Sequence, residues 1–166
     1  MMRNLLFLLL FSAMILTSCE KKGEPSPVGE LYSAEQILNL PKDKSLDGKL
    51  IQVEGYISFC SKRPLRMNSK NKITITTEQY CQGTKLIDAN IFMSSASVSY
   101  KPGGETPRNY ISVTDINKVT ADSMVFILDD YSEDSNEKFM ISGKLLFDGS
   151  GYSLEELTFI KAAAKQ

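Results

Sequence analysis

The sequence predicts a mainly β domain, a small antiparallel barrel of five to six strands with a short N-terminal helix. Three observations support this prediction. From Asp47 onward, apolar and polar residues alternate with a period of two in several short segments, as in half-buried strands. Gly55 and Gly143 each interrupt such a segment, and an interior glycine is typical of the bends that a small closed barrel requires. The turn sequence at residues 148–151 separates the last two segments into a hairpin.

The predicted elements follow one another without a second domain boundary. Ser33 and Gln36 form the capping-box pattern of a helix start and Pro41 ends the segment, which predicts a short helix. Residues 94–109 contain two prolines and two glycines and predict a long loop, and residues 114–119 predict a short helical turn. The predicted strands occupy residues 49–58, 73–77, 86–93, 124–128, 138–147 and 152–160.

Two segments of similar design resemble a known barrel family. They are residues 47–57 (DGKLIQVEGYI) and residues 139–145 (FMISGKL), the latter followed by residues 152–154 (YSL). Their order resembles that of exported OB-fold proteins, and most closely the tRNA-anticodon-binding-like OB domains of bacterial envelope proteins, over residues 31–161. This implies an OB-like barrel, with another small β-barrel or sandwich as the alternative. The excursion at residues 94–123 exceeds the family's usual link between the third and fourth strands, which leaves the strand order there open.

The N-terminus carries an export signal. Arg3 precedes a twelve-residue apolar stretch, which is too short to cross about 30 Å of hydrocarbon as a helix. The sequence Leu16-Thr17-Ser18-Cys19 that follows resembles the lipobox of bacterial lipoproteins. The resemblance implies acylation of Cys19, for example with palmitate, and anchoring in a membrane of the bacterial cell envelope. We expect the outer membrane, on its periplasmic or surface face, rather than the inner one. A plain secretory signal with an incidental cysteine is the alternative.

The domain organisation follows from these signals. Residues 1–18 form the lipoprotein signal peptide. Residues 19–30 are rich in charge, proline and glycine and predict a flexible tether that holds the folded domain off the lipid surface. Residues 31–161 form the OB-like barrel domain, and residues 162–166 form a short C-terminal tail.

Composition argues against an enzyme. The chain contains no histidine, which excludes Ser-His-Asp and Cys-His catalysis and the zinc sites built on two or three histidines. An enzyme that uses lysine or carboxylates is the alternative. We expect neither a cofactor nor a metal. The net charge is −1, and it becomes −2 once Arg3 is removed with the signal peptide, so bulk charge does not recruit the protein to nucleic acid.

Cys60 and Cys81 are the thiols that remain beside Cys19. In an oxidising compartment an even pair predicts a disulfide. Free buried thiols are the alternative. Redox or metal chemistry is disfavoured, because the Cys-x-x-Cys spacing is missing and two cysteines are too few for a structural zinc.

The family resemblance also suggests where a ligand would bind. OB folds use the face of their second and third strands, flanked by inter-strand loops. Residues 59–72 fall in the first of these loops and carry five basic residues and no acid. Arginine suits bidentate contacts to phosphate or carboxylate, so we expect an anionic glycan, lipid headgroup or acidic protein as partner. A solvated hairpin loop is the alternative. The candidate ligand-binding residues are Lys62, Arg63, Arg66, Lys70 and Lys72.

Nucleic-acid binding would require aromatic side chains beside these charges. Tyr56, Phe59, Tyr80 and Phe92 are available, but such residues in strands more often belong to the core, and the compartment argues against nucleic acid.

Two acidic features have structural interpretations. Asp88 lies within a predicted strand and is either a buried carboxylate or an outward-facing residue. Residues 129–137 predict an exposed turn rather than a calcium site, because the EF-hand spacing is missing. We therefore expect a lipid-anchored cell-envelope protein that acts as a non-enzymatic binding or interaction module for an unidentified ligand. A structural accessory subunit of an envelope protein complex is the alternative.

Overall fold

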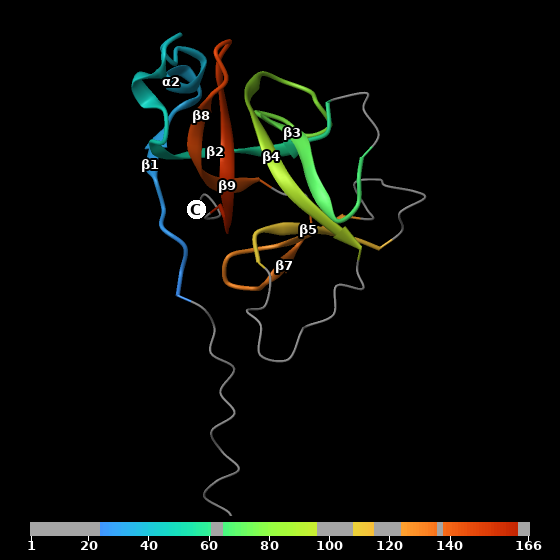
Figure 1. Ribbon diagram of the computed structural model, residues 1–166. Coiled ribbons are helices and arrows are strands. Elements are labelled where there is room, and N and C mark those ends of the chain that lie inside the picture. The colour runs from blue at the N-terminus through green and yellow to red at the C-terminus, as the bar shows by residue number, and fades with distance from the viewer. Residues whose placement is uncertain (1–23, 61–64, 96–107, 115–123, 136–137, 163–166) are drawn as a thin grey trace, which may run out of the picture.

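The computed structural model describes residues 24–60, 65–95, 108–114, 124–135 and 138–162 (Figure 1). Its centre is a closed five-stranded barrel, which confirms the predicted OB-like fold class. The barrel strands are β2 (Leu50–Ser58), β3 (Ser69–Thr76), β4 (Lys85–Ser95), β8 (Phe139–Phe147) and β9 (Tyr152–Lys161). Hydrogen bonds close the ring in the order β2-β3-β4-β9-β8-β2. All neighbours are antiparallel except β4 and β9, which are parallel.

The first barrel strand takes part in both sides of the barrel because it changes partner at Gly55. Up to this residue β2 pairs with β8, and after it β2 pairs with β3. A Cβ atom on Gly55 would lie 2.6 Å from Cγ2 of Ile75 and 2.9 Å from the carbonyl oxygen of Thr76. Gly143 marks a second irregularity, where the register between β8 and β9 shifts. The two glycines therefore lie where the predicted bends occur.

Alternate strand residues fill the barrel interior. The inward residues predicted on β2 and β4 are at most 4 % exposed, which confirms the period-two pattern; they are Ile51, Val53, Ile57, Ile87, Ala89, Ile91 and Met93. Phe126, Phe139 and Phe159 pack together at one end of the core, with ring centroids 5.0 to 6.3 Å apart. The core is thus a single cluster that includes an aromatic residue from outside the barrel strands.

The short helix precedes the barrel as predicted. In α2 (Ala34–Leu38) the capping box is present: the Gln36 N–H donates to Oγ of Ser33, and the Ser33 N–H donates to Oε1 of Gln36. A 3₁₀ turn, η1 (Lys44–Leu46), leads from α2 into β2. The structure adds strand β1 (Glu30–Tyr32) before the helix, paired in parallel with β2. Three residues are too short a segment to show a strand pattern in the sequence.

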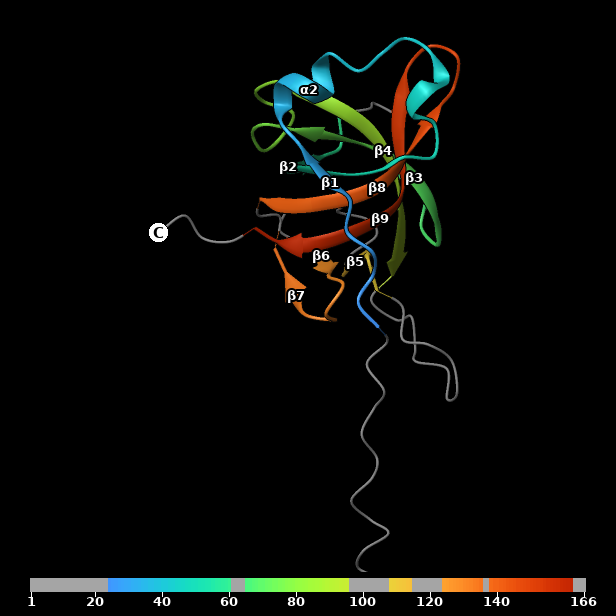
Figure 2. The ribbon, with the colours of Figure 1, turned by 90° about the vertical axis from the view of Figure 1, so that its left-hand side faces the viewer.

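Three further strands extend the sheet from β4, and we call them the extension. β5 (Tyr110–Val113) pairs in parallel with the end of β4, β6 (Met124–Ile127) pairs with β5, and β7 (Glu133–Asp134) pairs with β6. Figures 1 and 2 show the extension at one end of the barrel. β6 was predicted, whereas the sequence left β5 unassigned. The predicted helical turn at residues 114–119 lies outside the described residues, apart from Thr114.

Candidate functional site

The outer face of β3 and β4 presents cationic, amide and aromatic side chains in register. Lys70 lies opposite Phe92, and Lys72 lies opposite Asn90. These residues alternate with more buried ones, so their side chains point away from the core. Phe92 is 44 % exposed, a large apolar surface to leave in water. We call this surface the β3–β4 face and define it by Lys70, Lys72, Asp88, Asn90, Phe92 and Glu155.

Asp88 stands at the centre of a salt-bridge network on this face. Its carboxylate oxygens lie 2.8 Å from Nζ of Lys72 and 2.9 Å from Nζ of Lys85, and the Thr74 hydroxyl donates to it at 2.9 Å. Burial by itself raises the pKa of the Asp88 carboxyl, but hydrogen bonds from the two lysines and Thr74 hold this pKa below its usual value. Asp88 is therefore ionised at neutral pH and offsets much of the charge of Lys72, one of the candidate ligand residues.

Glu155 brings β9 into the same face. Its Oε1 accepts a hydrogen bond from Nδ2 of Asn90 at 3.3 Å, and its Oε2 lies 3.7 Å from Nζ of Lys70. An exposed ion pair at this distance contributes little, so Lys70 is held more loosely than Lys72. The face therefore combines an aromatic surface, an amide, two acids and one loosely held cation beside the ring.

The structure describes three of the five candidate basic residues, and two of these, Lys70 and Lys72, lie on β3. Lys62 and Arg63 lie outside the described residues. Arg66 precedes β3, and Asn71 holds its backbone: the Arg66 N–H donates to Oδ1 of Asn71, and the Arg66 carbonyl accepts from Nδ2, both at 2.7 Å. The two lysines of the β3–β4 face belong to the strand itself, because β3 begins at Ser69 rather than at residue 73. They are thus strand residues and not part of a loop.

The predicted disulfide joins Cys60 to Cys81, with a Cα–Cα distance of 5.5 Å. It ties the end of β2 to the turn between β3 and β4. The adjacent Ser58 hydroxyl lies 2.9 Å from the Thr76 hydroxyl and accepts from the Cys81 N–H at 3.2 Å. Lys70 lies near the opposite end of β3, roughly 20 Å away at 3.3 Å per residue. The disulfide therefore fixes the far end of the hairpin and does not gather the described basic residues.

The four aromatic candidates have different environments. Phe59 packs against the core cluster, and Tyr56 is partly buried on β2. Tyr80 is exposed, but it lies in the turn beside the disulfide. Phe92 is thus the one of the four that stands directly opposite a candidate lysine.

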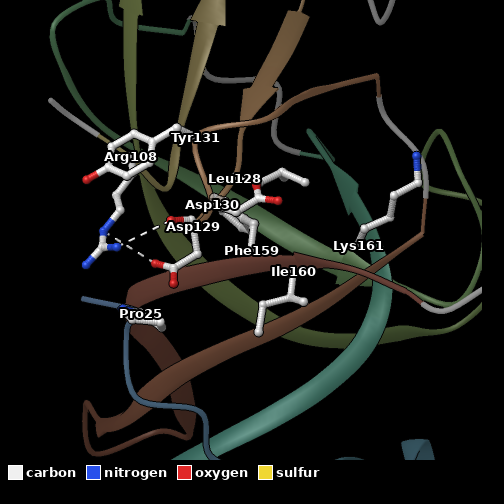
Figure 3. Close-up of a pocket in the computed structure, with 9 residues that line it drawn as sticks. All are labelled: Pro25, Arg108, Leu128, Asp129, Asp130, Tyr131, Phe159, Ile160 and Lys161. Atoms are coloured by element: carbon white, nitrogen blue, oxygen red, sulfur yellow. Dashed lines mark hydrogen bonds and ion pairs between the residues drawn. The ribbon is translucent and has the colours of Figure 1, made fainter. Parts of the chain in front are cut away.

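A second candidate site lies where the extension, β9 and the N-terminal segment meet (Figure 3). It is a cavity of about 520 Å³, a size typical of small-molecule pockets. Arg108 and Tyr131 lie on one side of it and Lys161 on the other. The apolar part of its wall includes Pro25, Leu128 and Ile160. The sequence does not indicate this site, because its residues come from four separate segments and share no motif.

Asp129 connects the cavity to the N-terminal segment. Its carboxylate accepts hydrogen bonds from the Ser26 N–H and from Nδ2 of Asn109, both at 2.8 Å, and its Oδ1 lies 3.5 Å from Nε of Arg108. Burial by itself raises the pKa of Asp129, but these contacts hold it below the usual value. The exposed turn predicted for residues 129–137 is wrong at two positions. The Asp129 side chain is only 11 % exposed, and Asp134 lies in β7 with its side chain 10 % exposed.

The segment expected to be a tether, residues 19–30, contacts the barrel in its described part. Nη2 of Arg108 donates to the Glu24 carbonyl at 2.5 Å. Gly29 approaches β2 so closely that a Cβ atom on it would collide with the backbone of Ile51. The composition of this segment predicts disorder. Its described part is nevertheless held by contacts with residues that lie far away in the sequence.

Several predictions concern parts of the chain without structural description. The predicted signal peptide and Cys19, the predicted lipidation site, lie outside the described residues. Within the described ranges, no helix has the length and apolarity needed to cross a bilayer. Those ranges also contain no group of three acidic or cysteine side chains arranged to hold a metal ion.

Comparison with protein-family models and with curated proteins gives no match for this chain. Among solved structures, the chain is similar to a protein from Klebsiella pneumoniae subsp. pneumoniae described as a "putative nucleic acid-binding lipoprotein". The two share 16 % sequence identity, and the match covers 80 % of this chain and 92 % of that one, with a TM-score of 0.41. Identity and TM-score this low carry no argument about what the chain does.

Proposed function

We propose that the mature chain is a lipid-anchored protein of the bacterial cell envelope that acts as a non-enzymatic binding module, with the β3–β4 face as its ligand surface. The lipobox-like sequence ending at Cys19 supports the anchoring, and the lack of histidine supports a role other than acid–base catalysis. The observation that carries the proposal is the exposed Phe92 ring placed directly opposite Lys70.

The chemistry of this face fits an anionic glycan. The Phe92 ring offers a flat apolar surface on which the C–H face of a sugar can stack. Asn90 and Glu155 supply a donor and acceptors for sugar hydroxyls, and the Lys70 ammonium can pair with an acidic group of the ligand. OB barrels use this strand face for oligosaccharides as well as oligonucleotides.

Nucleic acid fits the face less well. Binding to a phosphate backbone depends on cations whose charge is not already compensated. Here Lys72 and Lys85 both pair with Asp88, and Glu155 adds a negative charge beside Lys70. Sequence-tolerant binding of a single strand also uses several stacked aromatic residues, whereas the β3–β4 face as defined contains Phe92 alone.

The ligand face can be tested with defined acidic oligosaccharides, some carrying uronic acid and some phosphate. We expect Phe92→Ala to weaken binding about tenfold or more, as for loss of a stacking contact of about 1–3 kcal/mol. Lys70→Gln should weaken binding to a similar extent, because it removes a hydrogen bond from a charged group, which contributes about 1.5–3 kcal/mol. Leu146→Ala is the matched control for Phe92, because Leu146 is 43 % exposed but lies on β8. Lys144→Gln, also on β8, is the control for Lys70. Titration calorimetry measures all four variants, with neutral oligosaccharides and single-stranded DNA as comparison probes.

Two outcomes would contradict the assignment. Unchanged affinity in both Phe92→Ala and Lys70→Gln would remove the β3–β4 face as the ligand surface. Tighter binding of single-stranded DNA than of any acidic oligosaccharide would replace the glycan by nucleic acid. The anchoring is tested separately: Cys19→Ala should abolish both the mass increase from acylation and the partitioning into membranes.

One observation favours a structural accessory subunit as the second candidate. Val28, Leu31 and Leu38 are all exposed around β1 and α2, and β1 is the terminal strand of its sheet in the described part of the chain. Exposed apolar residues beside a sheet edge suit a protein partner. Crosslinking of the lipidated protein in its own envelope fraction distinguishes the two. Recovery of one stoichiometric protein, lost in Leu31→Ser, would select the accessory subunit.

A further inference from the structure

We infer that the cavity end of the barrel is the surface turned toward the membrane, and that a clasp between the N-terminal segment and the extension holds it there. The inference rests on the proposed lipid anchoring at Cys19 and deepens it by naming the protein surface that meets the lipid. We use the word clasp for Glu24 and Ser26 on one side and Arg108, Asn109 and Asp129 on the other.

The clasp is built from hydrogen bonds that reach across the molecule. Ser26 donates its N–H to the Asp129 carboxylate at 2.8 Å, and Arg108 donates to the Glu24 carbonyl at 2.5 Å. Asn109 secures the arrangement to the barrel, because its Oδ1 accepts the Phe159 N–H at 2.9 Å while its Nδ2 donates to Asp129. The clasp therefore links the start of the described chain to both the extension and β9.

The N-terminal segment is also attached to the barrel after the clasp, at residues 29–32. The Gly29 N–H donates to the Ser142 hydroxyl of β8 at 3.4 Å, and residues 30–32 form β1 on the edge of β2. In Figures 1 and 2 this N-terminal segment runs along the barrel from the end that carries the extension toward β1. The point where the anchored chain reaches the barrel is thus the clasp, beside the cavity, and not β1.

The length of chain before the clasp limits how far the barrel can stand from the lipid. Glu24 is five residues beyond Cys19 in the sequence, and five extended residues span at most about 18 Å. If the chain were free up to Glu30, eleven residues would span about 40 Å. The shorter distance keeps the barrel close to the membrane, with the clasp end nearest to it.

The side chains at this end suit the headgroup region of a bilayer. The Arg108 guanidinium lies over the Tyr131 ring at 5.6 Å from its centroid, and Lys161 lies on the other side of the cavity. Tyrosine and long cationic side chains are favoured at the membrane–water interface. Pro25 and Ile160 supply apolar surface between them, whereas Leu128 is only 2 % exposed and belongs to the core. Lys161 pairs with Asp134 at 2.9 Å, and Asp129 and Asp130 also lie at the cavity, so the contact requires no anionic lipid.

Tryptophan fluorescence tests the orientation directly, because the natural chain contains no tryptophan. Tyr131→Trp places a single reporter at the cavity, and Phe92→Trp places one on the β3–β4 face. The lipidated proteins are inserted into phosphatidylcholine vesicles whose acyl chains are brominated close to the headgroup. We expect the Tyr131→Trp reporter to be quenched at least twofold more than the Phe92→Trp reporter. Lys161→Trp replaces Tyr131→Trp if the latter does not fold.

The clasp is tested by adding Arg108→Ala and Asp129→Ala to the cavity reporter. The difference in quenching between the cavity and the Phe92→Trp reporter should then disappear. Amide exchange of the lipidated protein in detergent micelles gives an independent measure. The Ser26 amide should exchange at least tenfold more slowly in the native chain than in the double variant.

The failure of this inference can be distinguished from failure of the anchoring. If the protein does not float with the vesicles, the proposed anchoring is wrong and the inference falls with it. If the protein floats but both reporters are quenched equally, the orientation is wrong while the anchoring stands. A Ser26 amide that exchanges equally fast in the native chain and in the double variant would overturn the clasp.

Discussion

The barrel and the extension bury apolar side chains in different ways. The barrel strands have eight to eleven residues and close on themselves, so each pairs with a neighbour on both sides. The extension strands have four, four and two residues, and the series ends at β7. Yet Phe126 of β6 is fully buried against the barrel, and Asp129 in the next turn holds the N-terminal segment. The short addition thus completes sites that the closed barrel lacks by itself: with β9 and Pro25 it forms the wall of the cavity, and it holds the N-terminal segment in the clasp.

The largest effect we expect comes from the residue that joins the two regions. Phe126→Ala removes a ring whose centroid lies 5.0 Å from that of Phe139 and 6.3 Å from that of Phe159. The free energy of unfolding should therefore fall by about 3–5 kcal/mol. Urea denaturation measures this change. Phe92→Ala is the control, with an expected change within about 0.5 kcal/mol, because the ring is exposed. If Phe126→Ala left the free energy of unfolding unchanged, the extension would not share the core of the barrel.

The disulfide tests the barrel alone. It links residues 21 apart, and replacing Cys60 and Cys81 together by serine should lower the free energy of unfolding by about 3 kcal/mol through the entropy of the unfolded chain. Oligosaccharide binding at the start of β3 should persist under native conditions, because the bridge lies at the other end of this strand. Loss of binding in a variant that remains folded would show that the two ends are coupled.

A substitution at the bend in β2 should have a smaller effect on stability. Gly55→Ala brings a Cβ atom to 2.6 Å from Ile75 and 2.9 Å from the Thr76 carbonyl, which should destabilise the barrel by about 1–3 kcal/mol. Gly151→Ala is the control, because a Cβ atom there meets nothing within 4 Å. Equal stability of the two variants, measured by thermal unfolding, would mean that closure does not depend on a glycine at the bend.

The sequence allows the barrel to be predicted because its determinants are local. Period-two alternation marks the long strands, and Ser33 and Gln36 lie within one turn. The predicted export signal favoured a disulfide between Cys60 and Cys81, which the structure contains. β1 and β5 were missed because a parallel strand of three or four residues is defined by its partner, which lies elsewhere in the chain. Short segments of this kind carry no periodicity of their own.

The candidate site was predicted only in part for the same reason. Lys70 and Lys72 were named from their charge, but their environment depends on residues that a local pattern does not connect. Asp88 offsets Lys72 across the hairpin, and Glu155 reaches Asn90 from 65 residues away. The clasp depends on a still longer separation in the sequence, because Ser26 and Asp129 are 103 residues apart. Charge patterns thus locate a surface but do not show which charges are already paired.

The smallest effect we expect is a loss of Ser26 amide protection at low pH, and it distinguishes the clasp from the β3–β4 face. The folded protein holds the pKa of Asp129 below the usual value of 3.8, so the stabilisation from this carboxylate is complete above that pH and is lost as the pH falls through the folded-state pKa. The Ser26 amide should therefore be protected equally at pH 5 and pH 7 and lose protection below about pH 4.

Asp88 has a lowered pKa too, so the two carboxylates must be separated. Asp129→Asn removes the titrating group at the clasp and leaves the salt bridges of Asp88 with Lys72 and Lys85 in place. In this variant the local loss of Ser26 protection in acid should no longer follow a carboxylate titration, while the response of the β3–β4 face, read from the Lys72 and Thr74 resonances by NMR, should be unchanged. If the native chain and Asp129→Asn lost Ser26 protection over the same pH range, the N-terminal segment would be released by a group other than Asp129. The two regions would then differ through the stability of the barrel, and not through a clasp that titrates with Asp129.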